Sequence, residues 1–301
     1  MQKINIFNQD ILVRDEACSS SPEKVVKGRP SLRLYIKPTD SCNAKCMFCA
    51  NEQSKDFGNI NLKKLEFVIR YLKEKNVLHG VSITGGEPMT NPELIFQILD
   101  LIYNIDPNME VQVSTNGYNL LRFLDYRDVN KLESIHISRH HYDDKTNQAI
   151  FQSDSVATTK DITTFQERLD DKRIININTI VMKRYISNLE EIKRMLDYAS
   201  RVGVYKVGFI SLMQCNQFAK DNFINFNDIF SHLDEDFLLG HHFYSRDYCE
   251  CIDGLYLSKY DKLIEFYARM VKECSCPYTN QLVYTSDNRV TAGFGKKLLY
   301  K

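Results

Sequence analysis

Hydrophobic positions along the chain switch repeatedly between the spacing of strands and the spacing of helices. The apolar run LRLYI at residues 32–36 predicts a strand, and VSITG at residues 81–85 predicts another. Between them, residues 61–76 carry apolar side chains at helical spacing: Leu62, Leu65, Val68, Ile69 and Leu72. This order of strand, helix and strand favours parallel strands connected by the helix.

The same alternation continues to about residue 213. Further strands are predicted within VQVSTNG (residues 111–117), SIHISRHHYDD (134–144), RIININTIVMK (173–183) and KVGFISLM (206–213). Helical segments are predicted at residues 93–104, 118–127, 146–152 and 189–203. This order indicates an α/β fold with a parallel sheet or barrel, in which ligands sit at the C-terminal ends of the strands. Polar residues gather near those predicted ends: Ser114, Thr115, Asn116, Ser138, Arg139, Asn176 and Asn178.

The balance of charge argues against a general attraction to polyanions. The 301 residues include 39 Lys and Arg and 39 Asp and Glu, so the formal net charge is zero and nucleic-acid modification is disfavoured. The N-terminus lacks a signal-peptide pattern, and no run reaches the roughly 18 apolar residues that span a bilayer. We therefore expect a cytoplasmic protein without membrane contact, whose nine cysteines bind metal, take part in catalysis or lie inert in the core.

Three of these cysteines crowd into CNAKCMFC, residues 42–49: Cys42, Cys46 and Cys49. Core thiols would be scattered along a periodic apolar face, whereas these lie among polar residues just after a predicted strand. A structural zinc site normally has four ligands, and no fourth Cys or His is nearby in the sequence. Three thiolates can instead hold three irons of a [4Fe-4S] cluster and leave the fourth open. Core burial and zinc binding remain the alternatives.

The spacing C-x3-C-x2-C, with the aromatic Phe48 directly before the last cysteine, resembles the radical S-adenosylmethionine (SAM) superfamily. The resemblance implies a partial (β/α)6 barrel of the TIM type, with the cysteine loop after the first strand. It also implies that Cys42, Cys46 and Cys49 hold a [4Fe-4S] cluster whose open iron binds SAM. Reduction of the cluster would then cleave SAM to methionine and a 5′-deoxyadenosyl radical, which removes a hydrogen atom from the substrate.

The sequence GGEP follows the cysteines at the distance expected in that family: Gly85, Gly86, Glu87 and Pro88. Taken alone, it indicates a corner between a strand and a helix, where glycines supply unusual backbone angles. By resemblance, its backbone meets the amino group of the methionine part of SAM.

The resemblance assigns further SAM contacts near the predicted strand ends. Ser114 and Asn116 are candidates, although both are also ordinary turn formers before Gly117. Ser138 and Arg139 resemble family positions that contact the ribose and the carboxylate of SAM. The planar fork of an arginine suits a carboxylate.

Five other residues have less definite assignments. By resemblance, Phe48 and Met213 are expected near the adenine of SAM. His140 and His141 are either substrate contacts or part of a solvated loop. His136 lies within a predicted strand and is expected to be a hydrogen-bonded core residue.

Four further cysteines form two C-x-C pairs: Cys249, Cys251, Cys274 and Cys276. A predicted amphipathic helix at residues 259–273 separates the pairs. Chance burial and a zinc site are alternatives, but beside the first site we expect a second, auxiliary [4Fe-4S] cluster. Four ligands would close this cluster, so that it moves electrons and supports net oxidation or bond formation, whereas three would leave an iron open. Cys215 is a spare ligand, a catalytic thiol or an inert one, and Cys18 is expected to be inert.

The closest resemblance within the superfamily is to the molybdenum-cofactor-cyclase-like and SPASM/twitch branch. The tail CPYTNQLVYTSDNRVTAGF, residues 276–294, resembles a cluster-binding hairpin of two strands. The cyclase has another cysteine where this chain has Gly293, and KKLLYK replaces its terminal glycines. Cyclisation of GTP is therefore not expected. We expect an N-terminal extension over residues 1–33, the barrel over 34–215 and a small twitch-like auxiliary-cluster region over 216–301.

The predicted function is that of a radical SAM enzyme of oxidoreductase or mutase type. Residues 1–33 are too short for a leader-recognition domain, which favours a small metabolite over a ribosomally made peptide as the substrate. The Phe- and Asp-rich residues 219–248 line either a pocket or the core. The resemblance also implies an electron donor of the flavodoxin or ferredoxin type. A non-catalytic iron-sulfur or zinc protein is the alternative of another class, but it leaves GGEP unexplained.

Overall fold

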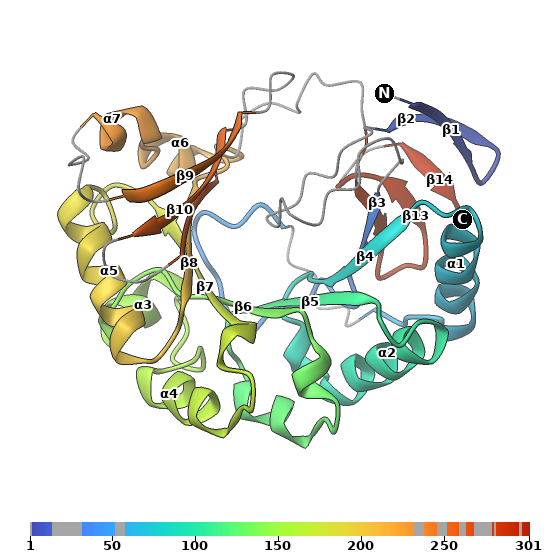
Figure 1. Cartoon of the computed structure of the whole chain (residues 1–301), viewed down its shortest axis with the longest axis horizontal. Coiled ribbons are helices and arrows are strands. Elements are labelled where there is room, and N and C mark those ends of the chain that lie inside the picture. The colour runs from blue at the N-terminus through green and yellow to red at the C-terminus, as the bar shows by residue number, and fades with distance from the viewer. Residues whose placement is uncertain are drawn as a thin grey trace. The chain divides into compact units, whose positions relative to one another are not determined.

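The structure is a computed structural model, and it describes residues 2–13, 32–51, 58–231, 238–245, 252–258, 263–267, 279, 281–294 and 297–301. Contacts divide the chain into two compact units. The first unit comprises Met1–Cys42, Asn51–Ser114 and Cys276–Lys301, and the second comprises Asn43–Ala50 and Thr115–Ser275. Each unit has its own strands and helices (Figure 1).

Parallel strands form the centre of the first unit. The order across its sheet is β14 (Leu298–Tyr300), β13 (Val290–Ala292), β12 (Gln281–Tyr284), β3 (Leu32–Ile36), β4 (Leu78–Ile83) and β5 (Glu110–Thr115). The strands from β12 to β5 run parallel to one another. β13 pairs antiparallel with β12, and β14 pairs antiparallel with β13. The pairing of β12 with β13 confirms the predicted C-terminal hairpin. A separate hairpin joins β1 (Gln2–Ile6) to β2 (Gln9–Val13).

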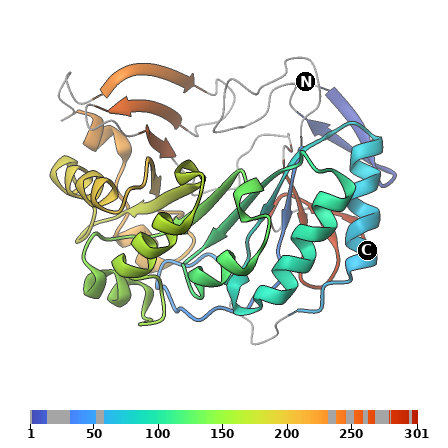
Figure 2. The same ribbon diagram turned by 60° about the horizontal axis from the view of Figure 1, so that its bottom comes forward.

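Two helices connect the parallel strands of this unit, α1 (Leu62–Glu74) and α2 (Pro92–Ile105). They lie side by side, in cyan and teal (Figure 2). Asn61 begins α1, because its side chain accepts a hydrogen bond from the N–H of Lys64 at 3.1 Å. The buried face of α1 contains predicted positions: Leu65, Val68, Ile69 and Leu72. The helical spacing read from the sequence is therefore confirmed.

The second unit repeats the parallel pattern. The order across its sheet is β6 (Ser134–Ser138), β7 (Ile175–Val181), β8 (Lys206–Ser211), β11 (Leu263–Tyr267), β10 (Ile252–Ser258) and β9 (Leu238–Ser245). The first four strands run parallel to one another. β10 pairs antiparallel with β11, and β9 pairs antiparallel with β10. Its helices are α3 (Asp144–Phe151), α4 (Thr159–Arg168), α5 (Leu189–Arg201), α6 (Gln217–Asp221) and α7 (Phe226–Phe230).

Side chains of this second sheet divide by face. Ile137, Ile177 and Val207 lie in one register row and are fully buried. The neighbouring row on the opposite face is polar and contains Ser138 and Asn178. Because successive side chains of a strand point to opposite faces, one face supplies the core and the other presents polar groups.

The predicted α/β class is confirmed. The strands from β3 to β8 follow one another in βα order, which is consistent with a partial TIM-type barrel. Residues 118–127 form the 3-10 helix η3 (Leu120–Asp125) in place of the predicted helix. Asn119 is the N-cap and has a left-handed backbone with φ of +53°, so the helix begins only at Leu120. No helix among the described residues combines the length and apolar content that crossing a membrane requires.

The predicted helix at residues 259–273 is wrong where the structure describes that segment. Leu263–Tyr267 is strand β11, which pairs with β8. Ile264 and Phe266 are fully buried, and the ring of Phe266 stacks on Phe209 at 5.5 Å. The burial thus alternates with the period of a strand. Pairing with β8 and this packing stabilise a strand, although the spacing of apolar residues in the sequence favours a helix.

Candidate functional site

The loop after β3 carries the three predicted cluster ligands. Cys42 belongs to the first unit, whereas Cys46 and Cys49 belong to the second. All three form no disulfide and are partly exposed to solvent. Within the described residues, no three His, Cys, Asp or Glu side chains are gathered closely enough to hold a metal ion. The ligand set stays a prediction that rests on the spacing and accessibility of the thiols.

Both glycines of GGEP lie directly against another stretch of backbone. The N–H of Gly86 donates to the carbonyl of Thr39 at 2.8 Å, and the N–H of Glu87 donates to the carbonyl of Ser41 at 2.8 Å. A Cβ on Gly86 would lie only 1.9 Å from that oxygen of Ser41, and Gly85 has a φ of +138°. The glycines therefore let the turn dock on the residues that lead into the first cysteine.

The acidic residue of the same turn is almost completely buried. Glu87 is 1% exposed, and its Oε1 accepts a hydrogen bond from the N–H of Met89 at 3.0 Å. This contact caps the 3-10 helix η2 (Pro88–Thr90). On the other side of the turn, Asn51 Nδ2 donates to the carbonyl of Gly85 at 2.9 Å. These contacts fix the shape of the turn, and its contact with SAM stays a prediction.

The end of β5 holds two further predicted residues. Ser114 is half-buried at the strand end, and Asn116 is 7% exposed. Asn116 Oδ1 accepts from the N–H two residues on, and its Nδ2 donates to Asn43 Oδ1 at 2.8 Å. A Cβ on Gly117, which has a φ of +84°, would meet the Cβ of Ala157 at 2.2 Å. Asn116 is therefore a turn former that also contacts the cysteine loop.

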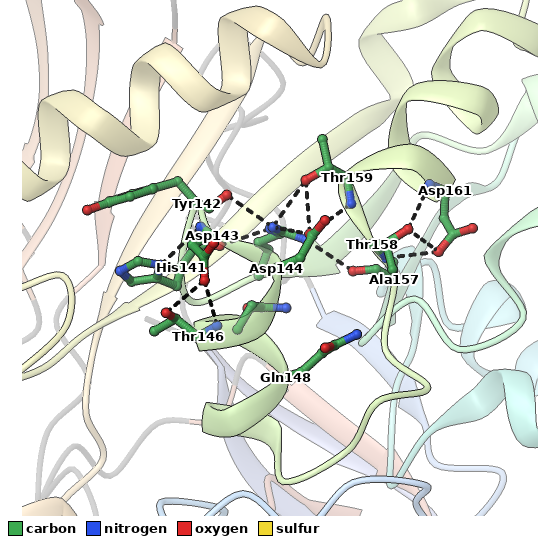
Figure 3. Close-up of polar contacts among 12 residues, drawn as sticks. His141, Tyr142, Asp143, Asp144, Thr146, Gln148, Ala157, Thr158, Thr159 and Asp161 are labelled. Carbon is green, nitrogen blue, oxygen red and sulfur yellow. Dashed lines mark hydrogen bonds and ion pairs between the residues drawn. The ribbon is translucent and has the colours of Figure 1, made fainter.

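Arg139 lies buried at the end of β6, with 1% of it exposed. Its guanidinium donates to the carbonyls of His141 (2.9 Å), Ala157 (3.1 Å) and Tyr142 (3.2 Å), to Asp144 Oδ1 (2.6 Å) and to Thr159 Oγ1 (3.4 Å). Asp144 and Thr159 are drawn with their contacts in Figure 3. These bonds tie the end of β6 to the first residues of α3 and α4. The predicted contact of Arg139 with the carboxylate of SAM stays a prediction.

Asp144 is the charged partner in this network. Burial alone would raise its pKa, but the hydrogen bond and charge of Arg139, together with the hydrogen bonds from Thr159, hold the pKa of Asp144 below its usual range. The N–H and Oγ1 of Thr159 add two hydrogen bonds to Asp144 Oδ1, both at 2.9 Å. Asp144 is therefore ionised at neutral pH, and its bonds with Arg139 and Thr159 hold the loop after β6 in place.

His140 and His141 are both buried, which contradicts a solvated loop. His140 is 4% exposed, and its Nδ1 accepts from the N–H of Ile180 at 3.2 Å. His141 is 9% exposed, and its Nδ1 accepts from the N–H of Asp143 at 3.0 Å. Burial lowers the pKa of His141, although the charges of Glu191 and Asp143 oppose it. The two rings as substrate contacts stay a prediction.

The polar face of the second sheet includes side chains that sequence reasoning left out. Lys206 on β8 pairs with Glu265 on β11 at 2.9 Å. His136 Nδ1 lies 3.2 Å from Asn178 Nδ2, so its expected hydrogen bonding in the strand is confirmed. A Cβ on Gly208 would stand 2.7 Å from Asn178 Oδ1. The alternation of polar and apolar residues in these strands could have predicted this polar face.

The sequence profile described as the Radical SAM superfamily matches residues 36–214. This range is more than half of the chain and runs from the end of β3 to just after β8. This chain belongs to the radical SAM superfamily. The resemblance read from the cysteine spacing and from GGEP is thereby confirmed.

Two curated relatives show the extent of the similarity. A GTP 3′,8-cyclase of Clostridium perfringens (strain SM101 / Type A) is 28% identical over 194 residues, which are 62% of this radical SAM chain and 57% of the relative. A probable GTP 3′,8-cyclase of Thermoplasma volcanium is 32% identical over 126 residues, 41% of this chain and 37% of the relative. The matched residues thus cover only 57% and 37% of the length of these relatives, and their activity is not carried over.

Solved structures of radical SAM proteins are similar at a lower level. Streptococcus suis SuiB bound to precursor peptide SuiA gives a TM-score of 0.47 with 23% identity, covering 60% of this chain and 39% of SuiB. A radical SAM methyltransferase from Sphaerobacter thermophilus gives 0.46 with 13% identity, covering 63% of this chain and 59% of that one. Similarity at this level carries no argument about the substrate.

The superfamily implies a [4Fe-4S] cluster and SAM as cofactors. The donor set of this radical SAM chain fits such a cluster in its chemistry, because three thiols with C-x3-C-x2-C spacing that form no disulfide can hold three irons and leave one open. Cys215 is also free and exposed, and its Sγ lies 3.9 Å from the carbonyl oxygen of Phe48. Met213, expected near the adenine, is 36% exposed.

The remaining cysteines fall outside the described residues: Cys18, Cys249, Cys251, Cys274 and Cys276. The auxiliary cluster expected at the two C-x-C pairs therefore stays a prediction. The division into an N-terminal extension (residues 1–33), a barrel (34–215) and an auxiliary-cluster region (216–301) likewise stays a prediction.

Proposed function

We propose that this radical SAM protein cleaves SAM reductively and removes a hydrogen atom from a polar small metabolite. One observation carries the proposal: three partly exposed thiols with C-x3-C-x2-C spacing, none of them in a disulfide, lie within the matched residues 36–214. Cys42, Cys46 and Cys49 would each hold one iron of a [4Fe-4S] cluster. When bound, that cluster supplies the electron that splits SAM into methionine and a 5′-deoxyadenosyl radical.

The task of the protein is then to hold SAM and the substrate in a fixed geometry and to exclude water. We assign contacts with SAM to Phe48, Gly85, Gly86, Glu87, Pro88, Ser114, Asn116, Ser138, Arg139 and Met213. The docking of Gly86 on Thr39 supports a rigid turn for the methionine end. The buried bonds of Arg139 support a second role for it, in which it holds the end of β6 and thereby places Ser138.

The polar face of the second unit supports a polar substrate. His136, Asn178, Lys206 and Glu265 form two pairs there, at 3.2 and 2.9 Å. These four side chains are polar or charged and only partly buried, so a polar ligand suits this face better than an apolar one. A small metabolite rich in hydroxyl, amino or carboxylate groups is such a ligand. A ribosomally made peptide is the alternative substrate class.

We also propose an auxiliary [4Fe-4S] cluster held by four cysteines: Cys249, Cys251, Cys274 and Cys276. The pairing of these residues as two C-x-C sequences supports the assignment. A cluster with four thiolate ligands is closed, so it would accept an electron from the substrate radical and make the net reaction an oxidation or a bond formation. A reduced flavodoxin or ferredoxin would supply the electron for SAM cleavage.

Release of 5′-deoxyadenosine tests this function. Wild-type protein, reconstituted with iron and sulfide without oxygen and then reduced, is expected to release 5′-deoxyadenosine from SAM. The Cys46→Ala variant loses a ligand and is expected to release none above background. Cys18→Ala provides the matched control, because that cysteine lies far from the motif in sequence and is expected to leave release unchanged.

The same assay separates the two substrate classes. The small-molecule fraction of a cell extract is expected to raise 5′-deoxyadenosine release above the level with SAM alone, and the peptide fraction is not. Stimulation by the peptide fraction alone would replace the metabolite with the peptide. Release that persists in the Cys46→Ala variant would contradict the cluster assignment itself.

A further inference from the structure

The segment Asn43–Ala50, which contains Cys46 and Cys49, is held by other parts of the second unit. Asn43 Nδ2 donates to Ser155 Oγ at 3.0 Å. The N–H of Lys45 donates to the carbonyl of Phe151 at 2.9 Å, at the end of α3. Neither contact involves a thiol, so the structure fixes the start of the segment without any help from the cysteines.

The ring of Phe48 anchors the middle of the segment. It packs against an apolar cluster of buried residues: Ile150, Met182, Leu212 and Ala219. Its edge faces the ring of His140, with the ring centres 5.3 Å apart. His140 in turn stacks on Phe151 at 4.7 Å. The aromatic residue between the two cysteines therefore has a fixed place in the core of the second unit.

Asn216, just after β8, contacts the backbone between the same two cysteines. Its Nδ2 donates to the carbonyl of Met47 at 2.9 Å. Its Oδ1 accepts from the N–H of Ala219 at 2.8 Å and so caps α6. One side chain thus joins the start of α6 to the peptide that separates Cys46 from Cys49.

We propose that Asn216 is a positioning residue that fixes the Met47 carbonyl and thereby orients Cys46 and Cys49 for the cluster. This role of Asn216 rests on the proposed function in one respect, which is that Cys46 and Cys49 are iron ligands. Groups that orient metal ligands through hydrogen bonds commonly change metal affinity or activity by about 10–100-fold when they are replaced. Asn216 lies outside the C-x3-C-x2-C and GGEP sequences, and the contact is visible only once β8 and the loop are brought together.

Replacing Asn216 with aspartate removes one of its two hydrogen bonds and keeps the other. Asn216→Asp keeps an oxygen that accepts from Ala219, and aspartate caps helices as well as asparagine does. It has no N–H to donate to Met47. Asn225→Asp is the matched control, because Asn225 caps α7 through its Oδ1, which accepts from the N–H of Asn227 at 3.0 Å. Both variants change the same group and the same charge.

Two measurements test the proposal, the first on protein without a cluster. In Asn216→Asp, amide hydrogen exchange across residues 43–50 is expected to be roughly three- to tenfold faster than in Asn225→Asp. The thermal unfolding midpoint is expected to be equal in the two variants. In reconstituted protein, iron loss to a chelator is expected to be about 10–100-fold faster in Asn216→Asp, with an altered electron paramagnetic resonance spectrum of the reduced cluster.

The outcomes separate this proposal from the proposed function. Equal exchange rates in the two variants would overturn the role of Asn216, and so would faster exchange with unchanged iron loss and an unchanged spectrum. A wild-type chain that takes up no iron would instead contradict the proposed function, and the exchange rates would then decide by themselves whether Asn216 holds the segment.

Discussion

Gly86 occupies a position where no side chain fits. Its Cα faces the carbonyl oxygen of Ser41, which a Cβ would approach to 1.9 Å, so Gly86→Ala requires backbone to move. We expect Gly86→Ala to lower the free energy of unfolding by about 1–3 kcal/mol, the usual cost of overpacking. Gly208→Ala is the comparison, because its Cβ would meet the side-chain oxygen of Asn178 at 2.7 Å, which can rotate away. Urea unfolding of both variants measures the difference, and an equal or smaller loss in Gly86→Ala would contradict the prediction.

Individual residues were predictable where the signal is local in sequence. Cys42, Cys46 and Cys49 were singled out because their spacing is local in the sequence, and their role as iron ligands stays a prediction. The lack of space for a side chain at Gly86 was not predictable, because it depends on contact with Ser41, which is far away in the sequence. The buried network of Arg139 was missed for a related reason, since its acceptors come from two segments, residues 141–144 and 157–159, and the second is distant in the sequence.

At the scale of elements, β3, β4 and β5 bring three titratable groups of the first unit together. Arg33 Nε lies 3.4 Å from His79 Nε2, and the guanidinium also pairs with Glu110 at 3.5 Å. Burial first, and the charge of Arg33 second, lower the pKa of His79 from 6.5 to about 4, although Glu110 opposes this shift.

This cluster predicts a pH dependence of stability. Between pH 6.5 and about 4, the unfolded chain binds a proton at His79 that the folded chain does not. The free energy of unfolding therefore falls as the pH drops through that window. His79→Gln keeps an acceptor for Arg33 but does not titrate, so its stability is expected to fall less than that of wild type. Urea unfolding at about pH 7 and about pH 5 measures this, and parallel losses in both proteins would count against it.

Most elements were predictable because burial follows the sequence period, as in α1 and β6. The helix α4 was missed, although Thr158 and Asp161 form a capping box that marks its start. Its apolar positions are few, so the period is weak. The segment at Leu263–Tyr267 was misassigned because pairing with β8, which no local pattern reveals, determined its structure.

At the scale of the whole chain, the family match over residues 36–214 and the order of strands agree with the fold expected from the sequence. The two compact units were not predictable, because they depend on which distant segments pack together. β12 and β13 illustrate this, since they come from the end of the chain and pair beside β3 in the first unit.

Iron and acid-labile sulfide per chain, in protein reconstituted without oxygen, test the central claim most directly. Wild type is expected to bind about eight irons, and the Cys42/Cys46/Cys49→Ala triple variant about four, because each cluster contains four. The matched variant with alanine at Cys249, Cys251, Cys274 and Cys276 is also expected to bind about four, and unlike the triple variant it keeps SAM cleavage. A triple variant that binds as much iron as wild type would contradict the assignment of the radical SAM cluster to these three cysteines.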